Sequence, residues 1–232
     1  MTRLAPGFDL LRSSWPILAA SDEKVTTRLN VTAAWDGAQI AQVDVAGERH
    51  VQDALFAAFS MFRQKDRWLS YERRLELLGK IVSLLDENRE CLALESARET
   101  GKPITDARRE VQRAIDCAVT ASARLQGDQD DDFPQKTDIR QPTVFGFIEP
   151  AGVAVAVLAA NHGLELAARY LFAAVAAGCP IIIKPSADAP LSCLRLVHML
   201  HEVGLPYVWS QCVVTQSDEV TRELIFDPRV AL

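Results

Sequence analysis

Apolar residues between about position 51 and position 125 recur every three or four residues, the spacing that gathers them on one face of a helix. The pattern predicts four helices. Ser70 is a suitable N-cap for the second of them. The third helix ends at Gly101-Lys102-Pro103, because glycine and proline stop a helix. The residues Thr100-Gly101-Lys102 also resemble part of a phosphate loop, but Pro103 stands where that loop needs Ser or Thr. The apolar stripes are Val51, Ala54, Leu55, Ala58 and Phe62, then Leu75, Leu78, Ile81 and Leu85, then Val111, Ala114, Ile115, Ala118, Ala121 and Leu125.

A different pattern precedes these helices. Residues 25–46 alternate apolar and polar positions as strands do, and Asp36-Gly37 is a hairpin signal between them. Residues 1–24 show no strong periodicity and are interpreted as an N-terminal arm. Residues 25 to about 136 therefore combine a hairpin with helices.

The pattern changes again after the acidic run 128–132, which we interpret as a solvated connector. Short, nearly continuous apolar runs now alternate with helical segments, which indicates a parallel sheet covered on both faces. The expected elements are a strand at 152–158, a helix at 164–177 that stops at Gly178, a strand at 180–184, a helix at 190–203, a strand at 211–215, a helix at 217–225 and a strand beginning at Val230. We divide the chain into an arm (1–24), a hairpin and helical part (25–136), a connector with an oligomerisation-type strand near 142–148 (137–150) and a Rossmann-like unit (151–232).

Composition narrows the class of protein. The chain has 232 residues, is 49% hydrophobic and 24% charged, and carries a net charge of −6 with no basic stripe, which argues against nucleic-acid binding. No charged-then-apolar leader opens the sequence and no apolar run reaches the length of a membrane span. Five scattered cysteines without a C-x-x-C pair are typical of reduced thiols, so we expect a cytoplasmic protein without a membrane partner.

Two polar residues follow neighbouring strands of the expected parallel sheet. Asn161 comes after the first strand and Lys184 ends the second, and ligands of such sheets bind at the carboxyl ends of the strands. Lys184 is a candidate for ribose or phosphate contacts, or else extends to solvent. Asn161 is a candidate oxyanion donor, or else caps the helix that follows it, and from position alone the cap is favoured.

The order of motifs resembles that of the aldehyde dehydrogenase superfamily over about residues 25–232. The matching segments are "ETGKP" at 99–103, "EPAGVAVAVLAANHG" at 149–163, "IIIKPSADAPLS" at 181–192, "EVGLP" at 202–206 and "DPRVAL" at 227–232. Asn161-His162 is similar to the branch of the family with N-H-P. The resemblance implies an α/β fold with an incomplete Rossmann-like parallel sheet and an NAD- or NADP-dependent oxidation of a small aldehyde by a homo-oligomer.

The resemblance also implies roles for individual residues. Asn161 then helps to form the oxyanion hole. Lys184 contacts the adenosine ribose or its 2′-phosphate, and the cofactor-lining segments contain Leu158, Ala159, Ala160, Ser186 and Ala187. Ala187 stands where the family commonly has the ribose-binding glutamate, which removes a carboxylate that repels a 2′-phosphate, while Asp188 follows one residue late.

The family's glycine loop, general base and nucleophilic cysteine are expected after Leu232, and none of the five cysteines has the nucleophile's context. The sequence therefore resembles the N-terminal half of such an enzyme, which alone is expected to be inactive. The alternative is a non-catalytic aldehyde dehydrogenase-like module that binds a nucleotide or pairs with another subunit.

Overall fold

The computed structural model describes residues 12–127 and 149–232. Its first part contains β1 (Ser14–Trp15), β2 (Arg28–Thr32), β3 (Gln39–Asp44), α1 (Glu48–Phe62), the 3₁₀ turn η1 (Lys65–Arg67), α2 (Tyr71–Glu87), α3 (Arg89–Thr100) and α4 (Ile104–Gly127). Its second part contains β4 (Ala154–Val157), α5 (Gly163–Ala177), β5 (Ile181–Lys184), α6 (Leu191–Glu202), the 3₁₀ turn η2 (Tyr207–Trp209), β6 (Ser210–Cys212) and α7 (Asp218–Phe226). The acidic run and the expected strand at 142–148 lie outside the described residues.

The parallel sheet predicted from the second part is confirmed. Its strands lie in the order β4-β5-β6, and both pairs are parallel. The strand expected to begin at Val230 forms a parallel bridge with Val153, so it starts beside β4. The third strand is shorter than predicted and ends at Cys212, whose N–H donates to the carbonyl of Leu18 at 2.7 Å.

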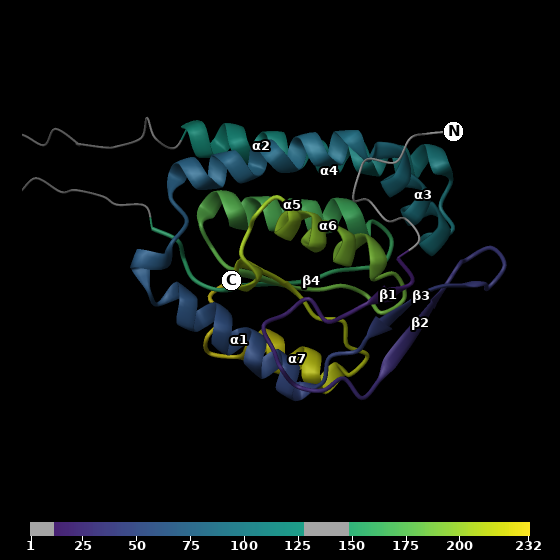
Figure 1. Cartoon of the computed structure of the whole chain (residues 1–232), viewed down its shortest axis with the longest axis horizontal. Helices are drawn as coiled ribbons and strands as arrows, with labels where there is room; N and C mark the ends of the chain where they lie inside the picture. Colours follow the sequence, from purple (N-terminus) through teal and green to yellow (C-terminus); the bar gives the residue numbers. More distant parts are fainter. Residues whose placement is uncertain (1–11, 128–148) are drawn as a thin grey trace, which may run out of the picture.

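Helices cover both faces of this sheet, as the continuous apolar strands predicted (Figure 1). Ile181 and Ile183 belong to the core formed with α5 and α6, whereas Ile182 belongs to a second core with α1 and α7. Helices α2, α3 and α4 form a further layer outside α5 and α6 (Figure 1). Because the side chains of Ile181, Ile182 and Ile183 all enter a core, β5 has no polar position before Lys184.

The N-terminal part contains a second, three-stranded sheet. β2 and β3 are antiparallel and are joined through Gly37 at a φ of 68°, so the predicted hairpin is confirmed. The described part of the expected arm is packed: β1 pairs with β3 in parallel, and Trp15 and Leu18 are buried. A strand of two residues is too short to produce a periodic pattern, so sequence reasoning had no signal for it.

The predicted helices are confirmed, and their ends fix the segments that approach the site. Ser70 caps α2, its hydroxyl accepting a hydrogen bond from the N–H of Arg73. Gly101 ends α3 with a φ of 73°, in the left-handed region that favours glycine. In the described part of the chain, no helix is both long and apolar enough to cross a membrane.

Candidate functional site

The candidate site begins where β4 and β5 end. The two strands are neighbours, with Val157 opposite Lys184, and the N–H of Leu158 donates to the carbonyl of Lys184 at 2.9 Å. The structure thus brings together the loops that follow the two strands, as the predicted topology required. Lys184 is half-buried, whereas Asn161 is exposed at the start of α5.

The residues assigned to cofactor binding occupy these two loops. Leu158 is buried, Ala159 is exposed and Ala160 is half-buried after β4. Ser186 and Ala187 are half-buried after β5. The Ser186 hydroxyl lies 3.4 Å from the Asp188 carboxylate and accepts a hydrogen bond from the Asp188 N–H at 3.3 Å. Asp188 is therefore turned back toward Ser186, and the position of Ala187 carries no carboxylate. The cofactor roles of all these residues stay predictions.

The interpretation of Asn161 as a helix cap is wrong. His162 occupies the N-cap position of α5, and no side chain at that position makes a cap hydrogen bond. The N–H groups of Leu164 and Glu165 instead donate to Oε1 of Glu110, at 2.9 Å and 3.2 Å. A carboxylate from α4 therefore supplies the cap from outside the helix, and the Asn161 side chain is not needed for it.

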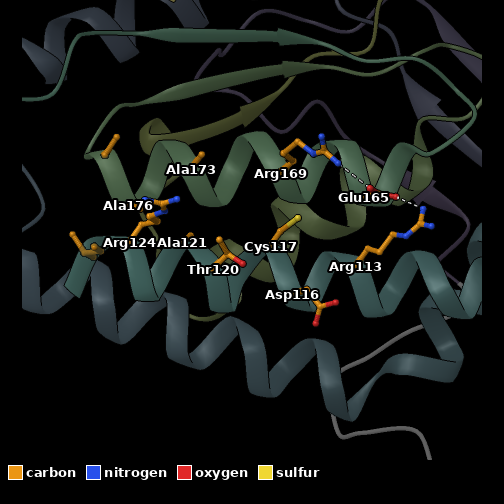
Figure 2. A pocket seen from close by; sticks show the side chains of 12 residues that line it. Arg113, Asp116, Cys117, Thr120, Ala121, Arg124, Glu165, Arg169, Ala173 and Ala176 are labelled. Carbon is orange, nitrogen blue, oxygen red and sulfur yellow. Dashed lines mark hydrogen bonds and ion pairs between the residues drawn. The ribbon is translucent and has the colours of Figure 1, made fainter. Parts of the chain in front are cut away.

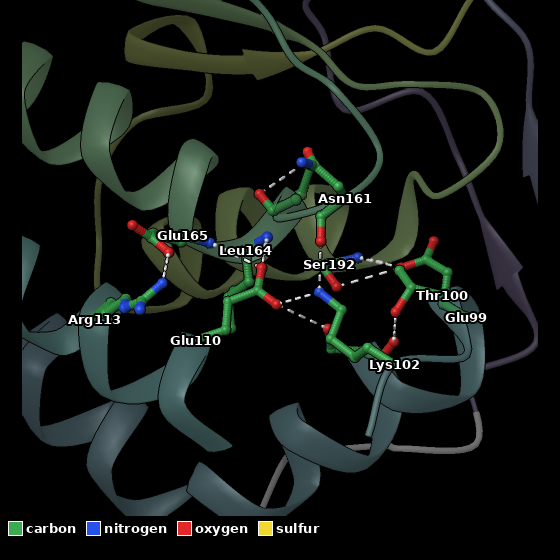
Figure 3. A network of polar contacts seen from close by, with 12 residues as sticks. Glu99, Thr100, Lys102, Glu110, Arg113, Asn161, Leu164, Glu165 and Ser192 are labelled. Carbon is green, nitrogen blue, oxygen red and sulfur yellow. Dashed lines mark hydrogen bonds and ion pairs between the residues drawn. The ribbon is translucent and has the colours of Figure 1, made fainter. Parts of the chain in front are cut away.

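The second oxygen of Glu110 completes a network that reaches Asn161 (Figure 3). Oε2 forms an ion pair with Nζ of Lys102 and lies 3.4 Å from the Ser96 hydroxyl. Nζ of Lys102 also donates to the backbone carbonyl of Asn161 at 2.9 Å. Glu110 is only 1% exposed, so both of its oxygens are desolvated and both have donors.

A second buried carboxylate does the same for α6. Glu99, at the end of α3, accepts hydrogen bonds from the N–H of Leu191 at 2.5 Å and from the N–H and hydroxyl of Ser192 at 3.3 Å each. Burial raises the pKa of Glu99 to about 8, although the hydrogen bonds from Leu191 and Ser192 lower it. The helices that follow β4 and β5 are thus both capped from the outer helical layer.

This capping restricts how a dinucleotide fits the site. Helix N-termini commonly bind phosphate, but those of α5 and α6 already hold Glu110 and Glu99. At the start of α7, the Ser217 hydroxyl accepts a hydrogen bond from the N–H of Val220, and two acidic residues occupy the first turn. These three helix N-termini therefore do not fit the phosphates of a dinucleotide, and a ribose at the end of β5 stays a prediction.

A groove with a volume of about 580 Å³ lies between α4 and α5 (Figure 2). Three arginines and two acidic residues line it among smaller and apolar side chains, which leaves a formal charge of +1: Arg113, Arg124 and Arg169 against Asp116 and Glu165. Glu165 pairs with Arg113 at 3.1 Å and with Arg169 at 3.0 Å. Burial raises the pKa of Glu165, but these two guanidiniums outweigh it and leave the pKa lowered.

Four of the five cysteines have the opposite of an activated thiolate's pKa shift. Burial raises the pKa of Cys91, Cys117, Cys193 and Cys212. The thiols of Cys91, Cys193 and Cys212 belong to buried residues. A nucleophilic cysteine needs a lowered pKa and access to substrate. The described residues also contain no cluster of histidine, cysteine and acidic side chains that could hold a metal ion.

Sequence reasoning missed Lys102, Glu99 and Glu110 as parts of the site. A signal was present for Glu110: it lies three residues after Ala107 and four before Ala114, on the apolar stripe of α4. A charged residue on a buried stripe implies a buried partner. Which partner it finds depends on the packing of α4 against α5, which periodicity does not specify.

Comparison with known proteins identifies the family. The family model described as "Aldehyde dehydrogenase family" matches residues 20–232. The chain is 31% identical to an aspartate-semialdehyde dehydrogenase (non-phosphorylating) of Halomonas elongata over 84% of its own length and 39% of that protein, and 29% identical to the mitochondrial succinate-semialdehyde dehydrogenase of Homo sapiens over 84% and 36%. It superimposes with a TM-score of 0.82 and 29% identity on aldehyde dehydrogenase 21 of Physcomitrella patens, solved in complex with the reaction product succinate, covering 94% of this chain and 46% of that one. The chain thus spans less than half the length of these relatives, and it belongs to the aldehyde dehydrogenase family.

Proposed function

We propose that the protein containing this chain is a nicotinamide-dependent aldehyde dehydrogenase that oxidises an aldehyde to a carboxylic acid. The observation that carries the proposal is the family match over residues 20–232, which includes both strand-end loops. In this assignment the chain supplies the ribose-binding side chains and an oxyanion donor. The nucleophile comes from another segment, consistent with the raised pKa of four of the five cysteines.

Asn161 is the proposed oxyanion donor. Its exposure at the end of β4, and the capping of α5 by Glu110, leave its amide available for a substrate oxygen. An amide aimed at a developing oxyanion stabilises the transition state more than the bound aldehyde. Asn161→Ala is therefore expected to lower kcat by roughly 10²–10³-fold with a small change in KM. Near-normal kcat in this variant would contradict the assignment.

We place the adenosine ribose at Lys184, Ser186 and Ala187, next to the backbone of Leu158, Ala159 and Ala160. When bound, the nicotinamide ring accepts the hydride removed from the aldehyde. Lys184 offers three donors to ribose hydroxyls or to a 2′-phosphate, and position 187 carries no carboxylate to repel that phosphate. We therefore expect the enzyme to accept NADP at least as well as an ordinary NAD-specific relative does.

Position 187 can be tested by binding alone. The chain should bind 2′,5′-ADP about 10-fold more tightly than 5′-AMP, the size of one charge-assisted contact. Ala187→Glu should reverse this preference by adding a carboxylate, whereas Ala123→Glu adds the same charge on the exposed side of α4 and is the control. Isothermal titration measures both ligands, and an unchanged preference in Ala187→Glu would show that position 187 does not set cofactor choice.

The substrate we propose is a small aldehyde that carries a carboxylate or a similar anionic group. The groove has a net positive lining, and one end of it, at Arg113 and Glu165, adjoins the start of α5 (Figures 2 and 3). Arginine matches a carboxylate through paired N–H donors. Two relatives named above are dehydrogenases of aspartate and succinate semialdehyde, and the solved relative holds succinate.

Paired substrates test the role of the groove. The enzyme should prefer succinate semialdehyde to butanal, which has the same number of carbons and no charge. Arg169→Met should raise KM for the charged aldehyde by about 10-fold and leave the value for butanal almost unchanged, because one charged hydrogen bond is lost. Equal effects on both aldehydes would contradict anion binding.

The second candidate is a non-catalytic module of the same family, and the raised pKa values of four of the five cysteines are equally consistent with it. It predicts nucleotide binding without turnover by any natural protein that includes these residues.

We further propose that the protein assembles as a homo-oligomer and works in the reducing environment of the cytoplasm, consistent with its free cysteines. Sedimentation velocity tests the first of these proposals and cell fractionation the second.

A further inference from the structure

An ion pair of the outer helical layer, Lys102 with Glu110, is hydrogen-bonded to the strand-end segment that carries Asn161. Lys102 follows the end of α3, and its Nζ lies 2.9 Å from the Asn161 carbonyl, 59 residues away in sequence. Glu110 on α4 holds the same ammonium. The Lys102 side chain is 12% exposed and that of Glu110 is 1% exposed, so solvent and salt screen the pair weakly.

The same pair holds both ends of the short segment from Asn161 to Glu165. Lys102 binds the carbonyl at its beginning, and Glu110 binds the N–H groups of Leu164 and Glu165 at its end. Figure 3 shows this arrangement, with Lys102 and Glu110 facing the loop from the side of the helical layer. The backbone of Asn161 is therefore held by a charge-assisted bond from the outer helical layer.

We propose that Lys102 is a positioning residue, which holds the backbone of Asn161 so that its side-chain amide is directed into the strand-end site. The proposal rests on the proposed function, in which that amide stabilises the oxyanion. Loss of Lys102 allows the segment to move, and a displacement of about 1 Å in a catalytic group costs roughly 10²-fold in rate. Lys102 does not touch the substrate in this scheme and acts through Asn161.

A purely structural ion pair would behave differently. Its removal would lower the free energy of unfolding and leave the environment of the Asn161 amide, and kcat, as they were. A test therefore needs variants that remain folded and a readout at Asn161 itself.

The double variant Lys102→Met/Glu110→Gln removes both charges together. It avoids an unpaired buried charge, which is the costly consequence of removing one partner alone. The glutamine introduced in place of Glu110 keeps one carbonyl oxygen for the N–H groups of Leu164 and Glu165, so the cap of α5 is retained. The methionine introduced in place of Lys102 fills the space of the lysine stem without a donor for the Asn161 carbonyl.

The matched control is Arg195→Met/Glu95→Gln. Arg195 and Glu95 form another ion pair between the helical layer and the sheet-covering helices, at 2.6 Å, with side chains 3% and 9% exposed. The control thus removes a comparably buried pair between α3 and α6. Its residues make no hydrogen bond to Asn161 among those in the described structure.

Selective labelling gives a direct readout, because the chain contains only three asparagines: Asn30, Asn88 and Asn161. In the protein labelled with [¹⁵N]asparagine, the double variant should shift the backbone and side-chain amide signals of Asn161 and leave those of Asn30 and Asn88 in place. The control variant should leave all three in place. Unchanged Asn161 signals in a folded double variant would overturn the proposal.

Kinetic measurements distinguish the positioning role of Lys102 from the proposed role of Asn161 as the oxyanion donor. In the active enzyme the double variant should lower kcat by roughly 10-fold to 100-fold with KM within about two-fold, and the control should keep both values. A shifted Asn161 signal with unchanged kcat would support positioning by Lys102 and refute Asn161 as the oxyanion donor. A loss of kcat without a shift would overturn positioning by Lys102, whatever Asn161 does.

Discussion

The side-chain caps of four helices, α2, α5, α6 and α7, differ in where the cap comes from. α2 and α7 are capped locally by the residue that precedes them, Ser70 and Ser217. α5 and α6 are capped by Glu110 and Glu99, which lie 54 and 92 residues earlier in the chain. The local caps stabilise single helices near the surface. The remote caps also fasten together two layers, at the two loops that carry the candidate site residues.

The two remote caps differ from each other in charge balance. Glu110 is paired with Lys102, whereas the hydrogen-bond partners of Glu99 are the backbone and hydroxyl groups of Leu191 and Ser192. A buried carboxylate with a cation keeps its charge compensated, and one with neutral donors depends on pH. The loop after β4 is therefore held by a charge pair, and the loop after β5 by a group that titrates.

The largest effect is expected for Glu110→Ala. This change leaves Lys102 without its anion and two N–H groups of α5 without an acceptor. We expect the free energy of unfolding to fall by about 3–5 kcal/mol, the usual cost of breaking a buried ion pair from one side. Urea denaturation followed by circular dichroism measures it.

The control for that experiment is Glu90→Ala. Glu90 pairs with Arg108 on the surface, where the two side chains are 43% and 53% exposed. An exposed pair contributes far less to stability than a buried one. Equal losses in Glu110→Ala and Glu90→Ala would show that the remote cap is no stronger than a surface contact.

The next effect concerns pH and the other remote cap. The folded-state pKa of Glu99, about 8, lies above its ordinary value of 4.5, so the folded chain binds more protons than the unfolded chain between these values. The contribution of Glu99 to the free energy of unfolding is then fully present below about pH 4.5 and decreases as the pH rises toward 8. The expected loss from Glu99 alone is roughly 3 kcal/mol between pH 5 and pH 8.

Glu99→Gln sharpens this prediction, because the amide resembles the protonated acid and does not titrate. The variant should lose less stability than the wild type over the same pH range. Glu90→Gln is the control of opposite sign, since hydrogen bonds from Arg108 lower the pKa of Glu90. Parallel stability curves for Glu99→Gln and the wild type would contradict the raised pKa of Glu99.

Local and remote caps also differ in how far they follow from sequence. Ser70 precedes an amphipathic stripe, and this adjacency was enough to predict the start of α2. The strand order near Lys184 followed from short crossovers between apolar runs. The capping roles of Glu99 and Glu110 could not be predicted in this way, because their partners depend on how α3 and α4 lie over α5 and α6. The same limit applied to Asn161, for which local position favoured a cap that a distant residue supplies.

The smallest effect is expected for a local cap, Ser70→Ala. The change removes the hydroxyl that accepts the N–H of Arg73 at 3.2 Å, and loss of such a cap costs about 1 kcal/mol. Ser83→Ala, on the exposed middle of α2, is the control and should be neutral or slightly stabilising, because alanine favours helix interiors. Urea midpoints with unchanged slopes measure both. Because the cap of α2 is confined to one helix, Ser70→Ala should also leave the Asn161 amide signals in place. A shift of those signals would show that local caps, too, act on the site, and the distinction between local and remote caps would then fail.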